Sequence, residues 1–314
     1  MEKSKVVIVG TGFVGMSYAY ALLNQGAVEE LILIDIDHEK ALGEAMDLNH
    51  GLPFAPRKMT IKAGSYNDCK DAGLVVITAG VNQKEDETRI HLLNRNATIM
   101  KSVVNSVMKS GFDGIFLVAS NPVDILSYVA WKESGLPKSK VIGSGTSLDT
   151  ARLRYEISQF VNIDSRNVHA YILGEHGDSE FVAWSNAHIG AKSIQDVLNT
   201  MEEINFEDLE TIHKKVKNAA YEIIKRKKAT YYGVGMALVR ITQAIFNNEN
   251  RILPISVLND GLYSCEKNVY IGLPAVLNRD GVHHVVKLNL SIDEERKLQH
   301  SANILRTNLE KMGY

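Results

Sequence analysis

Cysteine is scarce in this 314-residue sequence, which contains only Cys69 and Cys265. The two lie far apart, and neither they nor the histidines show the Cys-x-x-Cys or His-x-x-x-His spacing of metal ligands. The scarcity excludes a disulfide framework, and the spacing gives no reason to expect a metal. We expect both cysteines to be unreactive thiols of a protein in the reducing cytoplasm.

Long apolar runs and an excess of one charge are also missing. No stretch reaches the roughly eighteen apolar residues of a membrane span. A strand-like run begins within a few residues of Met1, so we expect no signal peptide. Lys and Arg number 35 against 37 Asp and Glu, a net charge of -2 that indicates no nucleic-acid or membrane-surface partner. The length, with 45% hydrophobic residues, predicts two domains.

A glycine motif follows the first apolar run, residues 5–9. Gly10, Gly12 and Gly15 form Gly-x-Gly-x-x-Gly, the pattern of a strand that turns sharply into a helix whose N-terminus faces a pyrophosphate. Asp35 ends the next apolar run, where its carboxylate suits ribose hydroxyls and repels a 2′-phosphate. A purely structural turn uses the same glycines, but the acid at this distance favours NAD binding.

Strands and helices alternate through the first half of the chain. We expect strands at 59–63, 73–77 and 114–118, and helices at 38–48 and 90–109. This alternation predicts an α/β fold, a Rossmann-type doubly wound parallel sheet that binds ligands beyond the carboxyl ends of its strands. The polar segment 78–89 is long for a connection within such a fold, which is typical of a lid, although a plain surface loop is the alternative.

The pattern changes around residues 141–147, where we place a domain boundary. The expected division is a NAD-binding domain at 1–145 and an α+β substrate domain at 146–314. In the second half we expect helices at 148–160, 206–226 and 232–247, strands at 168–173, 251–258, 269–271 and 282–290, and a capping box at 291–294 that opens a helix to about residue 311.

Four residues of the second half could carry chemistry. Asp149 and Arg152 are three apart on one predicted helix and share a face, whereas Arg154 faces elsewhere. If both arginines bind anions, there are two anion sites; the alternative for each is a surface salt bridge. His176 lies in Gly-Glu-His-Gly-Asp, a constrained and exposed context, and imidazole suits proton transfer near neutral pH.

The motifs together resemble the lactate/malate dehydrogenase family, and within it the bacterial L-lactate dehydrogenases. They run in order over nearly the whole chain: Gly10 to Gly15 with Asp35, Thr78-Ala-Gly80 to Arg89, Asn121-Pro122, Leu148-Asp149 to Arg152, Gly174-Glu-His176-Gly-Asp178, and Ala229-Thr230-Tyr-Tyr-Gly233.

The resemblance implies catalytic roles for His176, Asp149, Arg152 and Arg89. His176 would exchange the hydroxyl proton of L-lactate while hydride moves to or from NAD. Asp149 would orient His176, Arg152 would hold the substrate carboxylate through two parallel bonds, and Arg89 would close over the site and polarise the carbonyl. The substrate-binding residues implied in addition are Gln83, Asn121, Asp124 and Thr230.

The implied contacts with NAD extend beyond the glycine motif. They are Gly10, Gly12, Val14, Gly15, Asp35, Lys40, Tyr66, Gly80, Val81, Ser102, Ala119, Asn121 and Ser144.

Substrate choice would depend on Gln83. Malate enzymes of the family have arginine here to meet a second carboxylate, so glutamine favours pyruvate. In one departure from related bacterial enzymes, Glu85 and Asp86 replace a Pro-Gly pair in the lid. The replacement changes how the loop bends and adds negative charge that opposes the entry of anionic pyruvate.

Arg154 and His169 match positions at which bacterial relatives bind fructose 1,6-bisphosphate, an activator, across a subunit interface. The resemblance also implies a cytoplasmic homotetramer that acts in fermentative glycolysis. Two rival functions remain: a malate or other 2-hydroxy acid dehydrogenase, and a non-catalytic NAD-binding protein. The second has no need of His176, Asp149, Arg152 and Arg89.

Overall fold

The structure is a computed structural model that describes residues 4–81, 89–200 and 206–314. The chain divides into two compact units. The first unit comprises 1–144, 231–251 and 276–284, and the second comprises 145–230, 252–275 and 285–314.

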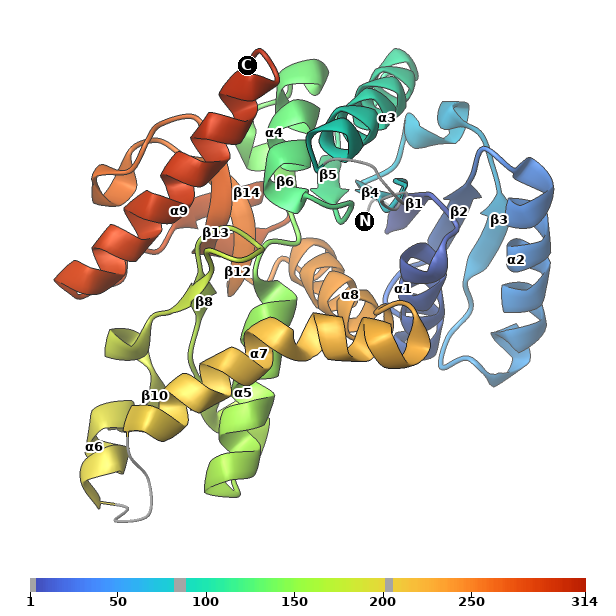
Figure 1. The fold of residues 1–314 in the computed structure, drawn as a ribbon. Coiled ribbons are helices and arrows are strands. Elements are labelled where there is room, and N and C mark those ends of the chain that lie inside the picture. Colours follow the sequence, from blue (N-terminus) through green and yellow to red (C-terminus); the bar gives the residue numbers. More distant parts are fainter. Residues whose placement is uncertain (1–3, 82–88, 201–205) are drawn as a thin grey trace. The chain divides into compact units, whose positions relative to one another are not determined.

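The first unit contains a parallel sheet in the order β6-β5-β4-β1-β2-β3 (Figure 1). Its strands are β1 (Lys5–Val9), β2 (Glu30–Ile34), β3 (Thr60–Ala63), β4 (Leu74–Ile77), β5 (Ile115–Val118) and β6 (Val141–Gly143). Residues of β1, β4 and β5 are buried on both faces, as a sheet covered by helices requires. The order reverses beside β1, which is the doubly wound topology, and the predicted fold class is confirmed.

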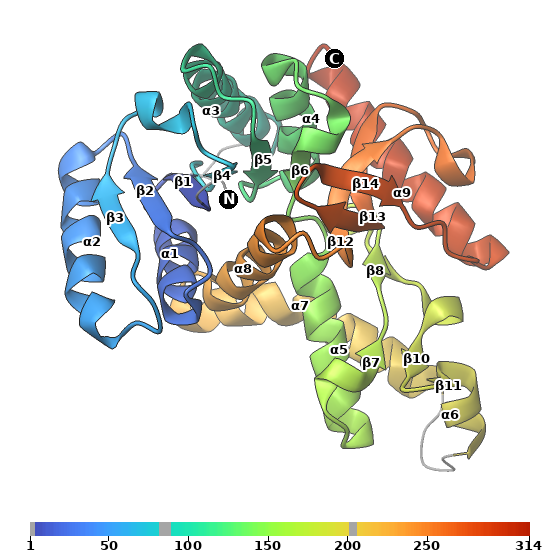
Figure 2. The same ribbon diagram turned by 180° about the vertical axis from the view of Figure 1, so that it is seen from behind.

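Helices of the first unit accompany this sheet. They are α1 (Phe13–Gln25), α2 (His38–Gly51), α3 (Arg89–Lys109), α4 (Val123–Ser134) and α8 (Tyr232–Phe246), with short 3-10 turns η1 (Leu52–Phe54), η2 (Tyr66–Cys69) and η3 (Lys138–Lys140). The two helices α1 and α8 pack side by side (Figures 1 and 2). Gly235 permits this approach, because a Cβ there would lie 3.0 Å from the backbone of Ser17 and Tyr18.

The second unit combines helices with short strands. Its helices are α5 (Ser147–Val161), α6 (Ile194–Thr200), α7 (Phe206–Lys227) and α9 (Ile292–Lys311), with 3-10 turns η4 (Ser165–Asn167), η5 (Trp184–Asn186) and η6 (Leu262–Ser264). Its short strands are β7 (Val168–His169), β8 (Ile172–Leu173), β9 (Phe181–Val182), β10 (His188–Ile189) and β11 (Lys192–Ser193). No helix within the described ranges combines the length and apolarity needed to cross a bilayer.

Three longer strands occur late in the chain. They neighbour one another in the order β14-β13-β12 and are β12 (Arg251–Asn259), β13 (Val269–Asn278) and β14 (Gly281–Val285).

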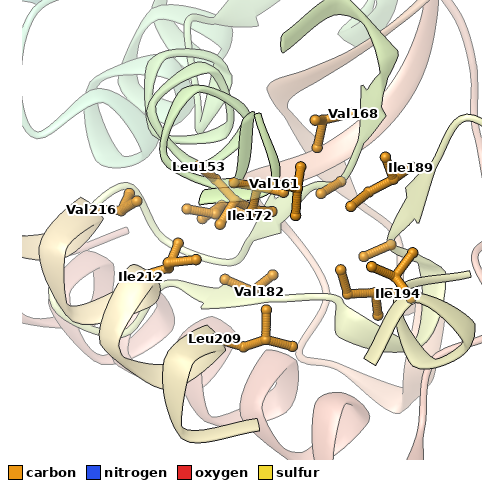
Figure 3. Packing of buried hydrophobic residues seen from close by; sticks show 14 residues of the cluster. Leu153, Val161, Val168, Ile172, Val182, Ile189, Ile194, Leu209, Ile212 and Val216 are labelled. Atoms are coloured by element: carbon orange, nitrogen blue, oxygen red, sulfur yellow. The ribbon is translucent and has the colours of Figure 1, made fainter. Parts of the chain in front are cut away.

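A buried apolar cluster holds the second unit together (Figure 3). Leu153 of α5 and Leu209 and Ile212 of α7 contribute to it, and both helices present apolar residues three or four apart. Ile172 of β8 and Val182 of β9 belong to the same cluster. This core therefore packs β8, which leads to His176, against α5, which carries Asp149.

Two strand predictions for the second half were wrong. The run 168–173 is not one strand, because β7 pairs with β10 whereas β8 pairs with β9, and the chain changes partners between them. The run 282–290 ends as a strand at Val285, and beyond it the Leu288 N–H donates to the Tyr263 hydroxyl. The predicted capping box is confirmed: the Ser291 Oγ accepts from the Glu294 N–H, and the Glu294 carboxylate accepts from the Ser291 N–H.

Both cysteines are buried and unpaired. Burial raises the pKa of the Cys69 thiol to about 12 and that of Cys265 to about 11. Little reactive thiolate is therefore present near neutral pH, which agrees with the expectation of unreactive thiols.

Candidate active site

A pair of threonines at the start of α5 brings two distant segments of the second unit together. Thr146, directly before α5, donates its hydroxyl to the Ile172 carbonyl at 2.6 Å, and the Thr150 hydroxyl accepts from the Ile172 N–H at 3.0 Å. Both threonines are buried. These bonds fix the first turn of α5, which carries Asp149, against the strand that leads to His176.

The turn that carries His176 is held from its other side by α9. Gly174 has a φ of +97°, and a Cβ there would lie 2.8 Å from the Ser301 hydroxyl. That hydroxyl accepts from the Glu175 N–H at 2.6 Å. Glycine is needed here because the backbone is left-handed and closely approached.

His176, Asp149 and Arg152 meet at this point, as the family resemblance implies. The Nδ1 atom of His176 lies 2.6 Å from Oδ2 of Asp149, and Arg152 donates to Oδ1 of the same carboxylate at 3.0 Å. The Asp149 side chain is 4% exposed, whereas Arg152 is 14% and His176 26% exposed. A buried carboxylate thus orients two cationic or basic side chains that solvent still reaches.

The charge of Asp149 is stabilised by these neighbours. Burial alone would raise the pKa of the Asp149 carboxyl, but attraction to His176, the hydrogen bond with it and the charge of Arg152 together hold that pKa below its ordinary value. When His176 is neutral, its Nδ1–H donates a hydrogen bond to the Asp149 carboxylate. The other ring nitrogen, Nε2, then exchanges protons with a substrate.

Glu180 is a second acid at the same place. Among the described residues, Asp149, His176 and Glu180 are the group whose ligand atoms, all within 4.8 Å of one another, could hold a metal. Asp149 and His176 already bond to each other, and Arg152 adds a positive charge beside them. This arrangement favours acid–base chemistry over the binding of a cation.

The glycine loop between β1 and α1 has the backbone geometry that its motif predicts. Gly10 has a φ of +107°, and a Cβ on Gly15 would lie 2.1 Å from the Gly10 carbonyl oxygen. At Gly12 a Cβ would meet nothing within 4 Å, so this side of the loop is open. Gly12 is also the N-cap of α1, where no side chain caps the helix. The open cradle and the helix N-terminus fit a pyrophosphate.

Asp35 lies at the end of β2, where its carboxylate is already organised by the glycine loop. Its Oδ2 accepts from the Thr11 N–H at 2.7 Å and from the Thr11 hydroxyl at 2.8 Å, and its Oδ1 accepts from the Asp37 N–H at 3.1 Å. Burial alone would raise the pKa of Asp35, but these hydrogen bonds outweigh it and lower that pKa. The carboxylate is therefore ionised and fixed beside the loop.

Other residues expected at the cofactor follow the carboxyl ends of the parallel strands, and these ends share one edge of the sheet. These are Gly80 and Val81 after β4, Ala119 and Asn121 after β5, and Ser144 after β6. Val14 and Lys40 lie in the first turns of α1 and α2, and Tyr66 in η2. The charge of Lys40 contributes to the lowered pKa of Asp35. Burial, with a contribution from the charge of Asp35, raises the pKa of Tyr66. Ser102 is exposed on α3.

Asn96 has a structural role that none of the sequence motifs predicts. Its buried side chain donates to the carbonyls of Val81 and Asn121, each at 3.2 Å, and accepts from the Val81 N–H at 2.9 Å. One amide thus ties together the segments that follow β4 and β5. The only available signal was a polar residue in the middle of an otherwise apolar helix stripe. Ser102, six residues further along α3, lies about 120° around the helix from it.

The other residues expected to bind substrate lie in different parts of the chain. Gln83 lies outside the described residues, as do Glu85 and Asp86, and Arg89 is described only as the first residue of α3. Asp124 is buried in the first turn of α4. Thr230 is half-buried in the second unit, between α7 and α8.

Arg154 faces away from the Arg152 pair, as helix geometry predicts. Its Nε donates to the Ala170 carbonyl at 3.1 Å, and its guanidinium lies 5.2 Å from the centre of the Tyr171 ring. His169 is exposed one residue before Ala170, directly opposite His188 in the β7–β10 pairing. Two separate cationic positions therefore exist on the two sides of α5.

Models of one protein family match almost all of the chain. The lactate/malate dehydrogenase NAD binding domain matches residues 4–143, and the lactate/malate dehydrogenase alpha/beta C-terminal domain matches residues 146–313. The chain belongs to the lactate/malate dehydrogenase family. Like the family, it is an NAD-dependent dehydrogenase, and the open cradle at Gly12 with the ionised Asp35 beside it fits that cofactor.

Several family members are similar over their full lengths. The L-lactate dehydrogenase 2 of Bacillus cereus is 54% identical over 306 residues, 98% of this chain and 97% of the relative. A lactate dehydrogenase enzyme from a Medee basin deep-sea metagenome library superimposes with a TM-score of 0.99 at 77% identity, with 100% of both chains covered. The minor L-lactate dehydrogenase of Enterococcus mundtii in its ligands-bound form gives 0.97 at 50% identity, with 99% of both chains covered.

Proposed function

We propose that this family member interconverts L-lactate and pyruvate. The observation that carries the proposal is the 2.6 Å contact between His176 and Asp149, with Arg152 on the other carboxylate oxygen. This arrangement supplies a proton donor and acceptor together with a guanidinium for a small acid. The relatives named L-lactate dehydrogenase support the same substrate pair.

His176 moves the proton in the proposed reaction. In pyruvate reduction, protonated His176 donates from Nε2 to the oxygen at C2, and in lactate oxidation the neutral imidazole accepts the hydroxyl proton there. The Asp149 carboxylate stabilises the imidazolium and holds the ring in the tautomer that presents Nε2. NAD, when bound, supplies or accepts the hydride.

Arg152 holds the substrate carboxylate. One of its nitrogens bonds to Asp149, which fixes the guanidinium plane, and the planar fork carries further donors for two parallel bonds to a carboxylate. Arg89 and Asn121 are proposed to polarise the C2 carbonyl, and Thr230 to line the pocket for the methyl group. Asp124 is assigned to the same site by resemblance.

Gln83 is proposed to select pyruvate over oxaloacetate, because a neutral amide does not compensate a buried second carboxylate. The experiment is an NADH oxidation assay with pyruvate and with oxaloacetate. We expect a kcat/KM for pyruvate at least tenfold higher. A preference for oxaloacetate would establish the malate alternative, and failure to oxidise NADH with any 2-oxo acid would leave a non-catalytic NAD-binding protein.

Fructose 1,6-bisphosphate is the proposed activator, and Arg154 and His169 its ligands. The cationic side of α5 described above, with exposed His188 opposite His169, supports an anion site separate from Arg152. We expect the effector to lower the KM for pyruvate in the wild type, and Arg154→Gln to weaken this response at least tenfold. Arg166→Gln is the matched control, because exposed Arg166 pairs with Asp164. A pyruvate saturation curve that the effector leaves unchanged would remove the proposal.

The proposed assembly is a cytoplasmic homotetramer. Apolar side chains exposed on helices of the first unit support burial against other copies, among them Tyr20 of α1, Leu42 and Met46 of α2, and Met236 of α8. Light scattering is expected to give four times the chain mass of 34.8 kDa. A monomer would contradict both the assembly and an effector site built across subunits.

A further inference from the structure

Glu180 is a buried acid for which the reaction above has no use. It is 6% exposed and lies just before β9, in the segment that carries His176, where its N–H donates to the Gly177 carbonyl at 3.2 Å. Its carboxylate has an oxygen within 4.8 Å of ligand atoms of both Asp149 and His176. Two carboxyl groups and one imidazole therefore share one largely enclosed space.

The charges around Glu180 come from three elements. Asp149 and Arg152 belong to α5, His176 to the segment after β8, and Lys217 to α7. Burial raises the pKa of Glu180 to about 8, and the negative charge of Asp149 adds to this, against the attraction of His176, Lys217 and Arg152. Lys217 is partly engaged elsewhere, because its Nζ donates to the Asp178 carbonyl at 2.6 Å. Glu180 is therefore mostly protonated near neutral pH, and Asp149 carries the negative charge.

We infer that Glu180 is a positioning residue that titrates together with the His176–Asp149 pair: it is neutral in the working enzyme, and when it ionises it holds a proton on His176. This inference rests on the proposed function for its kinetic consequence. Groups this close do not titrate independently, so protons leave the pair in shared steps. Loss of the Glu180 proton places a second negative charge beside the imidazole, which raises the affinity of His176 for its remaining proton.

Two kinetic consequences follow for pyruvate reduction. The reaction requires protonated His176, so an ionised Glu180 keeps the proton donor loaded to higher pH than Asp149 alone would. The same negative charge opposes the pyruvate carboxylate, so the KM for pyruvate rises as Glu180 ionises. A residue with a purely structural role would produce neither effect.

The first test is the pH profile of kcat for pyruvate, with KM measured separately at each pH, between pH 6 and 10 in Glu180→Gln. We expect its alkaline limb to lie about one pH unit below that of the wild type, and the rise in KM above pH 8 to disappear. Glu180→Met, which is apolar and of similar length, is expected to show the same displacement. Limbs that coincide with the wild type in both variants would overturn the inference.

Glu175→Gln is the matched control. Glu175 belongs to the same segment, but its carboxylate accepts from the Ser179 hydroxyl at 2.5 Å rather than joining the Asp149 group. We expect its alkaline limb to superimpose on that of the wild type. A displacement equal to that of Glu180→Gln would show a general charge effect and would contradict a specific role for Glu180.

The second test needs no turnover. A carboxyl whose pKa is about 8 when folded and about 4.5 when unfolded binds more protons in the folded state between these values, so its contribution to stability falls as pH rises from 4.5 to 8. The Tm of Glu180→Gln should therefore rise relative to that of the wild type as the pH increases from 5 to 8. The Tm of Glu175→Gln should show no such relative rise. If the Tm difference between Glu180→Gln and the wild type grows with pH but pyruvate is not turned over, the proposed function is wrong and the raised pKa of Glu180 stands. If the Tm difference stays constant in an enzyme that turns pyruvate over, the inference is overturned.

Discussion

Replacing Asp149 with asparagine removes the charge that the proposed mechanism uses to load His176. The two side chains touch at 2.6 Å, and the Asp149 side chain is only 4% exposed. Asparagine keeps the shape and one acceptor for Arg152, so the helix and the arginine should stay in place. What is lost is the attraction between a carboxylate and an imidazolium, and with it the fixed tautomer.

The size of this loss follows from Coulomb's law. Charge centres roughly 4 Å apart attract each other by about 4 kcal/mol at an effective dielectric constant of about 20, or about three pH units of proton affinity. Without this attraction, the imidazolium of His176, and a transition state that carries the same charge, lose about 4 kcal/mol of stabilisation. We therefore expect kcat/KM for pyruvate at pH 7 to fall about a thousandfold.

The assay is NADH absorbance with pyruvate from pH 5 to 8, with Asp164→Asn as control. Asp164 is an exposed acid paired with Arg166, and its replacement should change kcat/KM less than twofold. Lower pH protonates the imidazole of the variant again. The ratio of kcat/KM between the wild type and Asp149→Asn should therefore fall about tenfold for each unit by which the pH is lowered. A loss below tenfold at pH 7, or one that is the same at pH 5 and pH 7, would refute the electrostatic reasoning.

Two further changes test substrate choice and packing. Gln83→Arg should raise kcat/KM for oxaloacetate at least tenfold relative to pyruvate, because a guanidinium pairs with the second carboxylate; an unchanged ratio in the NADH assay would mean that specificity resides elsewhere. Tyr18→Phe should lower the free energy of unfolding, measured by urea titration, by about 1 kcal/mol. The variant loses the 2.6 Å hydrogen bond between the buried Tyr18 hydroxyl and Thr242, whereas Thr242 keeps its hydrogen bond to the Leu238 carbonyl. An unchanged free energy of unfolding would mean that the Tyr18–Thr242 bond has no net effect on stability.

Local patterns were sufficient to predict the cofactor half of the molecule. The roles of Gly10 and Gly15 depend on backbone conformation and close approach, which glycine alone permits, and the apolar runs identify buried parallel strands. Asp149 and Arg152 could be assigned to one face because helical spacing fixes it. Their meeting with His176 could be expected from chemistry and resemblance, but the contact itself depends on Thr146 and Thr150.

Contacts between distant segments could not be predicted in the same way. Thr11 fixes the Asp35 carboxylate, and Asn96 ties the segments after two strands, although no spacing in the sequence marks either pair. Residues 168–173 look like one strand because both ends are apolar, and only the partners of β7 and β8 reveal the break. The protonated state of Glu180 likewise depends on burial beside Asp149, which no short pattern records.

The central claim is that His176, held by Asp149, transfers a proton to pyruvate while NADH is oxidised. The most direct measurement compares NADH oxidation on pyruvate by the wild type and by His176→Ala, with NADH binding followed in parallel by fluorescence. We predict rapid turnover by the wild type, a loss of at least a thousandfold in the variant, and unchanged NADH binding. Turnover that survives in His176→Ala, or a wild type that binds NADH and does not oxidise it with pyruvate, would contradict the account.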